Sequence, residues 1–105
     1  MLKFVALWNV KEGISEAEFE HWYRTRHIPD ARSIPGLRKY TVNRAAEAGR
    51  ASSRFYRMAE LSFDSYEAMQ AAMPSPQWKH AFQDAQGYLA DHVRLQFDSE
   101  EIPLD

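Results

Sequence analysis

The segment 27–40 constrains the fold more than any other part of the chain. A helical run rich in aromatic residues leads into His27 and is stopped at once by Pro29, because proline disfavours helical backbone in the residue before it. A Pro-Gly turn at 35–36 follows, and then a strand-like run that carries two cations and Tyr40. This order places an imidazole at the C-terminus of a helix, close to where a sheet begins.

The rest of the chain supplies the other elements of the fold. Apolar patterns predict strands, and cap signals predict two helices, the second broken by prolines. The strands are expected at 2–10, 37–44, 54–63 and 92–97, the first helix from the capping box Ser15-Glu16-Ala17-Glu18 to Pro29, and the second from Asp64-Ser65-Tyr66-Glu67 through the break at Pro74-Ser75-Pro76 to Gly87. The order βαββαβ is the ferredoxin-like arrangement of the α+β class, with an antiparallel four-stranded sheet and helices on one face. We expect one domain over residues 1–105.

This architecture leaves one face of the sheet bare. Tyr56, Met58 and residues of the apolar first strand are predicted on that face, where they would form a costly exposed patch. A second copy of the same sheet would cover it. The sequence therefore predicts a two-fold homodimer, a dimeric α/β barrel with a space between or beside the sheets.

Composition excludes several classes of partner. The formal net charge is −2 and there is no cysteine, which argues against nucleic acid as a partner and removes disulfides, thiolate nucleophiles and cysteine-based metal sites. The histidines show no metal-ligand spacing, and no Gly-rich phosphate loop is present. The first residues lack a signal-peptide layout, and no apolar run is long enough to cross a bilayer. We expect a cytoplasmic protein without membrane partner, metal or cofactor.

His27 is the first candidate site residue. An imidazole where helix, turn and strand meet can act as a general acid or base near neutral pH. It can also simply complement the helix dipole, and spacing alone favours that interpretation. Tyr40 and Arg38 share one strand face, and together they could hold an enolate or phenolate. Alternatively, Tyr40 packs at the rim against a partner subunit.

A second group of polar residues is predicted on the bare sheet face. A carboxylate, a guanidinium and an imidazole that converge in a cavity would bind and polarise a small oxygenated substrate. The alternative is a structural Glu60–Arg94 ion pair beside a solvated histidine. The group consists of Tyr56, Glu60, His92, Arg94 and Gln96.

Several short motifs, spread over almost the whole chain, carry a family resemblance. They are Phe19-x-x-Trp22 leading to His27-x-Pro29, the run Ile34-Pro35-Gly36-Leu37-Arg38-Lys39-Tyr40, the run Ala59-Glu60-Leu61-Ser62-Phe63-Asp64-Ser65 followed by Glu67-Ala68, and later Ser75-Pro76 and Asp84. With these motifs the chain resembles the EthD family of the dimeric α/β barrel superfamily. The resemblance implies a homodimer with a small apolar pocket between sheet and helices, in which the histidine matching His27 is a recurrent pocket residue.

The resemblance also implies a range of chemistries. Members are linked to ether degradation operons, to muconolactone isomerisation, and to decarboxylation or oxidation of aromatic polyketides. The lactone-isomerising relatives use a cysteine, which this chain lacks. Cofactor-free monooxygenases of the same broad group use an Asn, a Trp and a His from elements comparable to those of Asn9, Trp78 and His80. Here Trp78 and His80 point to different sides of a helix, so we expect Trp78 in the core and a solvated His21 on the first helix.

We therefore expect a protein that binds a small aromatic, lactone or keto metabolite. His27 would transfer a proton, while Tyr40 with Arg38 or Arg94 would stabilise negative charge on oxygen. Residues expected to contact the substrate are Trp22, Tyr56, Met58, Glu60, His92 and Arg94. One alternative is cofactor-free oxygenation, and another is a non-catalytic carrier or accessory protein for an oxidoreductase. The loop 45–53 suits either a lid or an ordinary surface loop.

Overall fold

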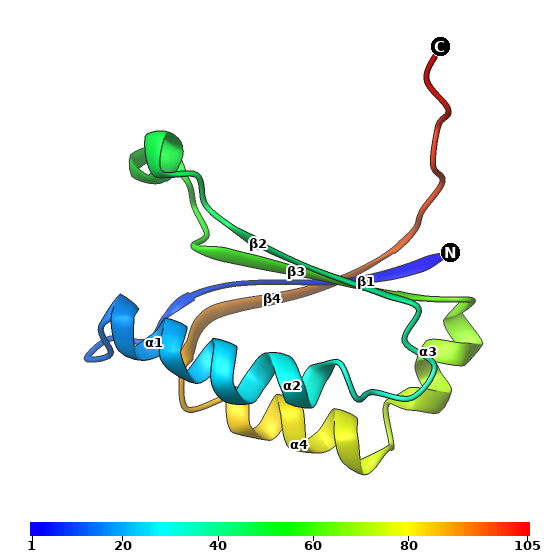
Figure 1. The fold of residues 1–105 in the computed structure, drawn as a ribbon, viewed down its shortest axis with the longest axis horizontal. Helices are drawn as coiled ribbons and strands as arrows, with labels where there is room; N and C mark the ends of the chain where they lie inside the picture. Colours follow the sequence, from blue (N-terminus) through cyan, green and yellow to red (C-terminus); the bar gives the residue numbers. More distant parts are fainter.

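The computed structural model describes residues 1–105. Four antiparallel strands form one sheet in the order β2-β3-β1-β4, and helices cover one of its faces (Figure 1). The strands are β1 (Leu2–Val10), β2 (Lys39–Arg44), β3 (Arg57–Phe63) and β4 (Leu89–Asp98), and the helices are α1 (Glu16–Trp22), α2 (Ile28–Ala31), α3 (Tyr66–Ala72) and α4 (Pro76–Ala85). A π-helical turn (Tyr23–His27) joins α1 to α2, and a short 3-10 helix (Glu47–Ser52) lies in the β2–β3 connection. The predicted α+β, ferredoxin-like fold is confirmed.

The helix starts are where the cap signals place them. The hydroxyl of Ser15 accepts a hydrogen bond from the backbone N–H of Glu18 at 3.1 Å, and Ser65 and Ser75 cap α3 and α4 in the same way. Each cap satisfies a backbone donor that would otherwise lack a partner. The break in the second helix at the prolines is likewise confirmed.

The prediction that the first helix ends at Pro29 is wrong. The chain widens into the π turn, in which the backbone N–H of Ile28 donates to the carbonyl of Tyr23, and then continues as α2 to Ala31. A proline inside a regular helix lacks the N–H and crowds the carbonyl four residues earlier. The π turn removes this conflict, because Pro29 then stands in the first turn of α2, where proline is tolerated. His27 therefore lies inside a continuous helical segment and not at its end.

The core lies between the sheet and the helices. Alternate residues of β1 and β3 face the helices, where they pack against aromatic residues of α1 and α4. On this side lie Leu2, Phe4, Ala6, Trp8, Ala59, Leu61 and Phe63, against Phe19, Trp22, Tyr23 and Trp78. The prediction that Trp78 belongs to the core is confirmed, and His21 is exposed as expected.

Two predictions about strand faces are wrong: the face assigned to the polar residues of β4, and the face assigned to Tyr56. Residues of β4 do alternate, but Arg94 pairs with Ala6 on the helix side, and Val93 pairs with Leu7 on the bare side. His92, Arg94 and Gln96 thus lie on the covered face. The pairing of β1 with β4 shifts by a bulge between Leu7 and Asn9, opposite the start of this run. Tyr56 precedes the regular part of β3, so the alternation does not extend back to it.

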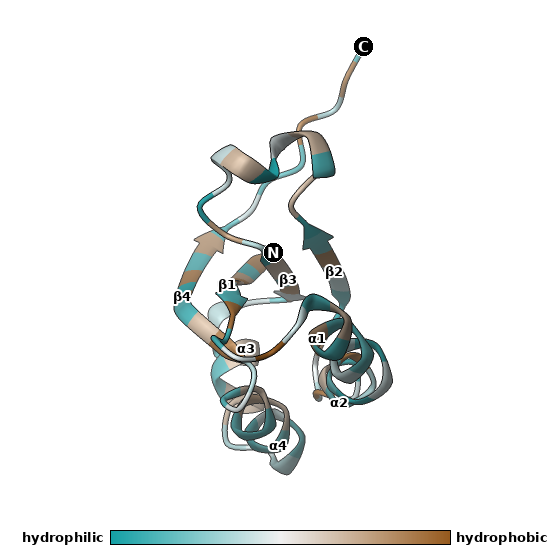
Figure 2. Ribbon diagram, turned by 90° about the vertical axis from the view of Figure 1, so that its left-hand side faces the viewer, coloured by the Kyte–Doolittle hydropathy of each residue, from teal (hydrophilic) through white to brown (hydrophobic).

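The other face of the sheet is uncovered, as expected. Figure 2 shows α1, α2, α3 and α4 on one side of the sheet, while the short helix of the β2–β3 connection and the C-terminal segment lie on the other side. The face carries an apolar patch with polar residues near it: Val5, Leu7, Met58, Val93, Leu95 and Phe97 among Lys3, Thr41, Asn43 and Glu60. None of the helices has the length and apolar character needed to span a membrane.

Candidate functional site

A small cavity lies between the sheet and the helices. Side chains from β1, β2, β3, β4, α2, α4 and the π turn line it: Ala6, Trp8, His27, Ala31, Tyr40, Ala59, Leu61, Phe82, Ala85, Leu89 and His92. A water-sized sphere can be centred over only about 20 Å³ of this space, which is room for about one water molecule. The lining is mostly apolar, and its polar groups are an indole, two imidazoles and a phenol.

The π turn brings His27 to this cavity. Its ring stacks on Tyr23 at 5.4 Å between centroids and lies 5.1 Å from the ring of Trp22. Nδ1 is buried and has no hydrogen-bond partner. Burial lowers the pKa of His27 to about 4, although the carboxylates of Asp30 and Asp84 oppose this shift. The imidazole is therefore neutral at physiological pH and available to accept a proton.

Tyr40 faces the same cavity from β2. Burial raises its pKa to about 12, while the neighbouring Tyr23 hydroxyl and the Arg57 guanidinium act in the opposite direction. Burial also raises the pKa of Tyr23, and Tyr40 adds to that shift. Both phenols stay protonated at neutral pH and can donate hydrogen bonds. Tyr40 is half-buried, and its hydroxyl lies inside this chain.

Four buried polar atoms in this region have no hydrogen-bond partner. They are Nε1 of Trp8, Oη of Tyr23, Nδ1 of His27 and Oη of Tyr40. Leaving one buried donor or acceptor unpaired costs about 1–3 kcal/mol. Three of these residues line the cavity and Tyr23 stacks on His27 beside it, an arrangement that calls for an explanation. A bound molecule that carries oxygen would satisfy several of them at once.

Trp22 supports His27 from outside the cavity lining. Its Nε1 donates to Asp84 at 2.8 Å, and its ring stacks on Tyr88 at 4.1 Å. Arg26 also pairs with Asp84 at 3.2 Å. These contacts tie α1 and the π turn to α4, which fixes the ring against which His27 packs.

Other predicted site residues do not reach the cavity. Arg38 pairs with Asp64 at 3.0 Å on the surface, which raises the pKa of the guanidinium. Glu60 lies on the bare face, where it pairs with Lys3 at 3.2 Å and accepts a hydrogen bond from Asn43. The proposed Glu60–Arg94 ion pair is therefore absent.

Three more of the predicted binding residues also lie away from the cavity. Met58 lies on the bare face near Leu7. Tyr56 lies on the helix side, but its hydroxyl donates to Glu20 at 3.0 Å away from the cavity. Arg94 lies over the ring of Phe82, 4.6 Å from its centroid.

His92 does line the cavity, from β4, and is exposed to solvent. Partial desolvation of its ring against the cavity and the neighbouring Arg94 lower the pKa of this imidazole. With Phe82 and Leu89, which are half-buried, it marks the solvent-facing edge of the site. The structure thus brings together His27, Tyr40 and His92 from the predicted set.

Two functional candidates were missing from the sequence prediction. Tyr23 lies four residues before His27, a spacing that places two side chains on the same helix face. Trp8 belongs to the helix-facing side of β1, and its Nε1 is unpaired beside the cavity. The Tyr23 spacing could have been noticed, whereas nothing in the sequence marks the indole of Trp8 as unpaired. No group of three or more His, Asp or Glu side chains is placed to hold a metal ion.

Solved structures of other proteins share the fold of this chain. A ferredoxin-like protein from Thermobifida fusca, described as dimeric, aligns with a TM-score of 0.74 at 21% identity and covers 91% of this chain and 88% of its own. SnoaB from Streptomyces nogalater, described as a cofactor-independent oxygenase, aligns with a TM-score of 0.71 at 16% identity over 96% of this chain and 94% of its own. At these identities the likeness concerns the fold alone.

Two other proteins are similar in sequence as well. An uncharacterized 11.0 kDa protein from the thcB-thcC intergenic region of Rhodococcus erythropolis is 25% identical over 88 residues, which cover 84% of this chain and 85% of that protein. An EthD family protein from Bacillus halodurans is 30% identical, with a TM-score of 0.84 over 95% of this chain and 99% of its own. The EthD domain model matches residues 11–93. The chain therefore belongs to the EthD family.

Proposed function

We propose that this protein binds a small, largely apolar metabolite with an enolisable or phenolic oxygen and moves a proton on it without a cofactor. The observation that carries the proposal is that three residues with an unpaired buried polar atom, Trp8, His27 and Tyr40, line one apolar cavity. A fourth such residue, Tyr23, stacks on His27. An apolar body would suit the alanines and Phe82, while an oxygen would accept hydrogen bonds from the phenol of Tyr40.

The protonation states of the free protein assign the roles. Neutral His27 can take a proton from carbon next to a carbonyl, and the electron pair of the broken C–H bond moves to the carbonyl oxygen as an enolate. Protonated Tyr40 donates to that oxygen and stabilises its charge. The developing negative charge also favours the imidazolium, so the pKa of His27 rises during the step. Return of the proton to another atom completes an isomerisation or an enolisation, and decarboxylation can use the same stabilised enolate.

Ligand entry requires movement at the open edge. A cavity with room for about one water molecule is far smaller than the roughly 300–1,000 Å³ of typical ligand pockets. Phe82 and Leu89 are half-buried side chains at that edge, and rotation of either would enlarge the space. The polar groups around His27 are fixed by packing, so this opening would leave them in place.

Two further functions make use of the same site. SnoaB, which has the same fold, is described as a cofactor-independent oxygenase, and removal of a proton by His27 could equally prepare an electron-rich substrate for reaction with O₂. A carrier or accessory protein would use the cavity without chemical change.

The location we propose is the cytoplasm, since the chain has no cysteine. We propose a homodimer that has no nucleic-acid or membrane partner.

The experiment is a screen of small phenols, β-diketones and lactones by ligand-observed NMR, followed by turnover assays on the compounds that bind. We expect His27→Gln to abolish turnover and Tyr40→Phe to reduce it, while Arg38→Gln leaves it unchanged. Oxygen uptake without added flavin or metal identifies the oxygenase. Binding with no chemical change, and tolerance of His27→Gln, would contradict the proton-transfer proposal and favour the carrier.

A further inference from the structure

Arg57 is a buried cation next to the cavity that no step of the proposed function uses. It is the first residue of β3, is 3% exposed, and its guanidinium lies over the ring of Tyr23 at 4.8 Å from the centroid. It does not line the cavity itself. Tyr23 contacts both this guanidinium and the ring of His27, so it connects the cation to the site.

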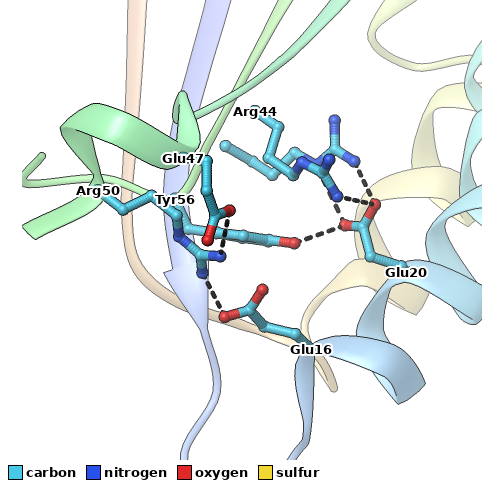
Figure 3. Close-up of polar contacts among 7 residues, drawn as sticks. Glu16, Glu20, Arg44, Glu47, Arg50 and Tyr56 are labelled. Atoms are coloured by element: carbon cyan, nitrogen blue, oxygen red, sulfur yellow. Dashed lines mark hydrogen bonds and ion pairs between the residues drawn. The ribbon is translucent and has the colours of Figure 1, made fainter.

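The charge of Arg57 is only partly neutralised. Glu20 of α1 is its acidic partner, through two hydrogen bonds of which that from Nε is 3.2 Å long. Figure 3 shows Glu20 in a polar cluster with Arg44 and Tyr56. The same carboxylate accepts a hydrogen bond from Tyr56 at 3.0 Å and lies 3.9 Å from Arg44. Burial would raise the pKa of Glu20, but these partners outweigh it and keep the carboxyl ionised. One carboxylate thus serves two guanidinium groups.

The other carboxylates of the cluster do not change this balance. Glu16 and Glu47 both pair with Arg50, at the exposed end of the cluster. Arg57 therefore presents net positive charge to the two phenols. The direction of its effect agrees, because it opposes the rise in the pKa values of Tyr23 and Tyr40 that burial causes.

We propose that Arg57 is a positioning residue that makes the tyrosine end of the cavity selective for an oxyanion. This inference rests on the proposed function and names the ligand class: an ionised phenol or enol. Its charged oxygen lies at Tyr40 and Tyr23, and its apolar body lies toward Phe82 and Leu89. The two ends are distinct because β2 and β4, which carry Tyr40 and Leu89, are the opposite edge strands of the sheet.

A matched pair of probes separates charge from shape. 4-Nitrophenolate and 4-nitrotoluene are nearly equal in size, and only the first carries an oxyanion at a pH where the phenol is ionised. Their dissociation constants are measured by calorimetry on the wild-type protein and on three variants. Arg57→Met removes the cation, Glu20→Gln removes the opposing carboxylate, and Arg44→Met removes the exposed partner of Glu20, which is not stacked on Tyr23.

We expect the wild-type protein to prefer 4-nitrophenolate, and Arg57→Met to reduce this preference on the order of tenfold. Glu20→Gln should act in the opposite direction and increase the preference. Arg44→Met should reduce the preference much less than Arg57→Met does, because the Arg44 side chain is exposed and its charge is screened by solvent. The opposite signs matter, since Arg57→Met leaves Glu20 buried without its main partner and can fail to fold. In that case the increase in Glu20→Gln alone supports the proposal.

Several outcomes would overturn the inference. If every variant loses both probes in parallel, Arg57 has a structural role only, and the proposed function is unaffected. The same holds if Glu20→Gln leaves the preference unchanged or lowers it. If the wild-type protein binds neither probe, the inference fails together with the proposed ligand class.

Discussion

Folding lowers the pKa of His27, and this shift makes the stability of the protein depend on pH. In the unfolded chain its pKa is near its ordinary value of 6.5, and in the folded protein burial lowers it to about 4. Between these values the unfolded chain binds more protons, so stability falls as the pH falls through this window and is independent of His27 above it. The full loss amounts to about 3 kcal/mol.

This predicts different pH dependences for two histidine variants. In urea unfolding at a series of pH values, His27→Gln should lose less stability than the wild-type protein between about pH 6.5 and about pH 4. His21→Gln, at an exposed position of α1, should retain the wild-type slope. Parallel curves for the wild type and His27→Gln would show that the imidazole is not held in a buried, neutral state.

The hydroxyl of Tyr40 is predicted to contribute more to the free energy of ligand binding than to the free energy of unfolding. Its hydroxyl is buried and unpaired, so Tyr40→Phe should leave the free energy of unfolding unchanged or raise it by up to about 1 kcal/mol. The same substitution should weaken binding of an oxygen-bearing ligand by roughly tenfold, the loss of one hydrogen bond. Tyr56→Phe is the control, since it removes the hydrogen bond to Glu20 and should destabilise the fold by about 1 kcal/mol. Chemical denaturation and calorimetry measure the two effects.

At the scale of elements, the sequence identifies the helix starts but not the π turn that positions His27. Serine caps and prolines act locally, so they are visible in the sequence. Whether a helix ends before Pro29 or widens to admit it depends on packing against α4, where Asp84 holds Trp22. The meeting of His27 with Tyr40 was predictable from helix, turn and strand. The position of Arg38 away from the cavity was not predictable, because it depends on the ion pair that Arg38 forms with Asp64 on the surface.

The alanines on α2, α4 and the sheet keep the cavity open. Ala85 lines it and is 2% exposed, and Ala72 of α3 is equally buried but packs elsewhere in the core. Ala85→Leu should fill the cavity and abolish ligand binding, and it should cost less stability than the same change at Ala72 because part of the added volume is already empty. Ala72→Leu has no space to fill, so it should destabilise the fold by about 1–3 kcal/mol. Equal destabilisation by both, or ligand binding that survives Ala85→Leu, would show that the cavity is not the binding site.

At the scale of the whole molecule, the bare sheet face explains why the face of β4 was assigned wrongly. Its alternation is plain in the sequence, and the rule that apolar residues face the core of the single chain predicts Val93, Leu95 and Phe97 on the helix side. Leu95 and Phe97 instead stand 42% and 49% exposed on the side away from the helices. A pattern of alternating residues specifies two faces, but it does not say which one the chain's own helices cover.

A second copy of the chain is our proposed cover for this face. Stable interfaces bury roughly 800 Å² on each partner, and an apolar sheet centred on Val5, Leu7 and Leu95 is a suitable core for one. Leu95→Glu places a charge there and should convert a dimer to monomers, as measured by native mass spectrometry across a dilution series. Tyr66→Glu changes a side chain that is 45% exposed on α3 and should keep the wild-type mass. A wild-type protein that is monomeric at every concentration would instead mean that this apolar face is exposed in solution or is covered by a different protein.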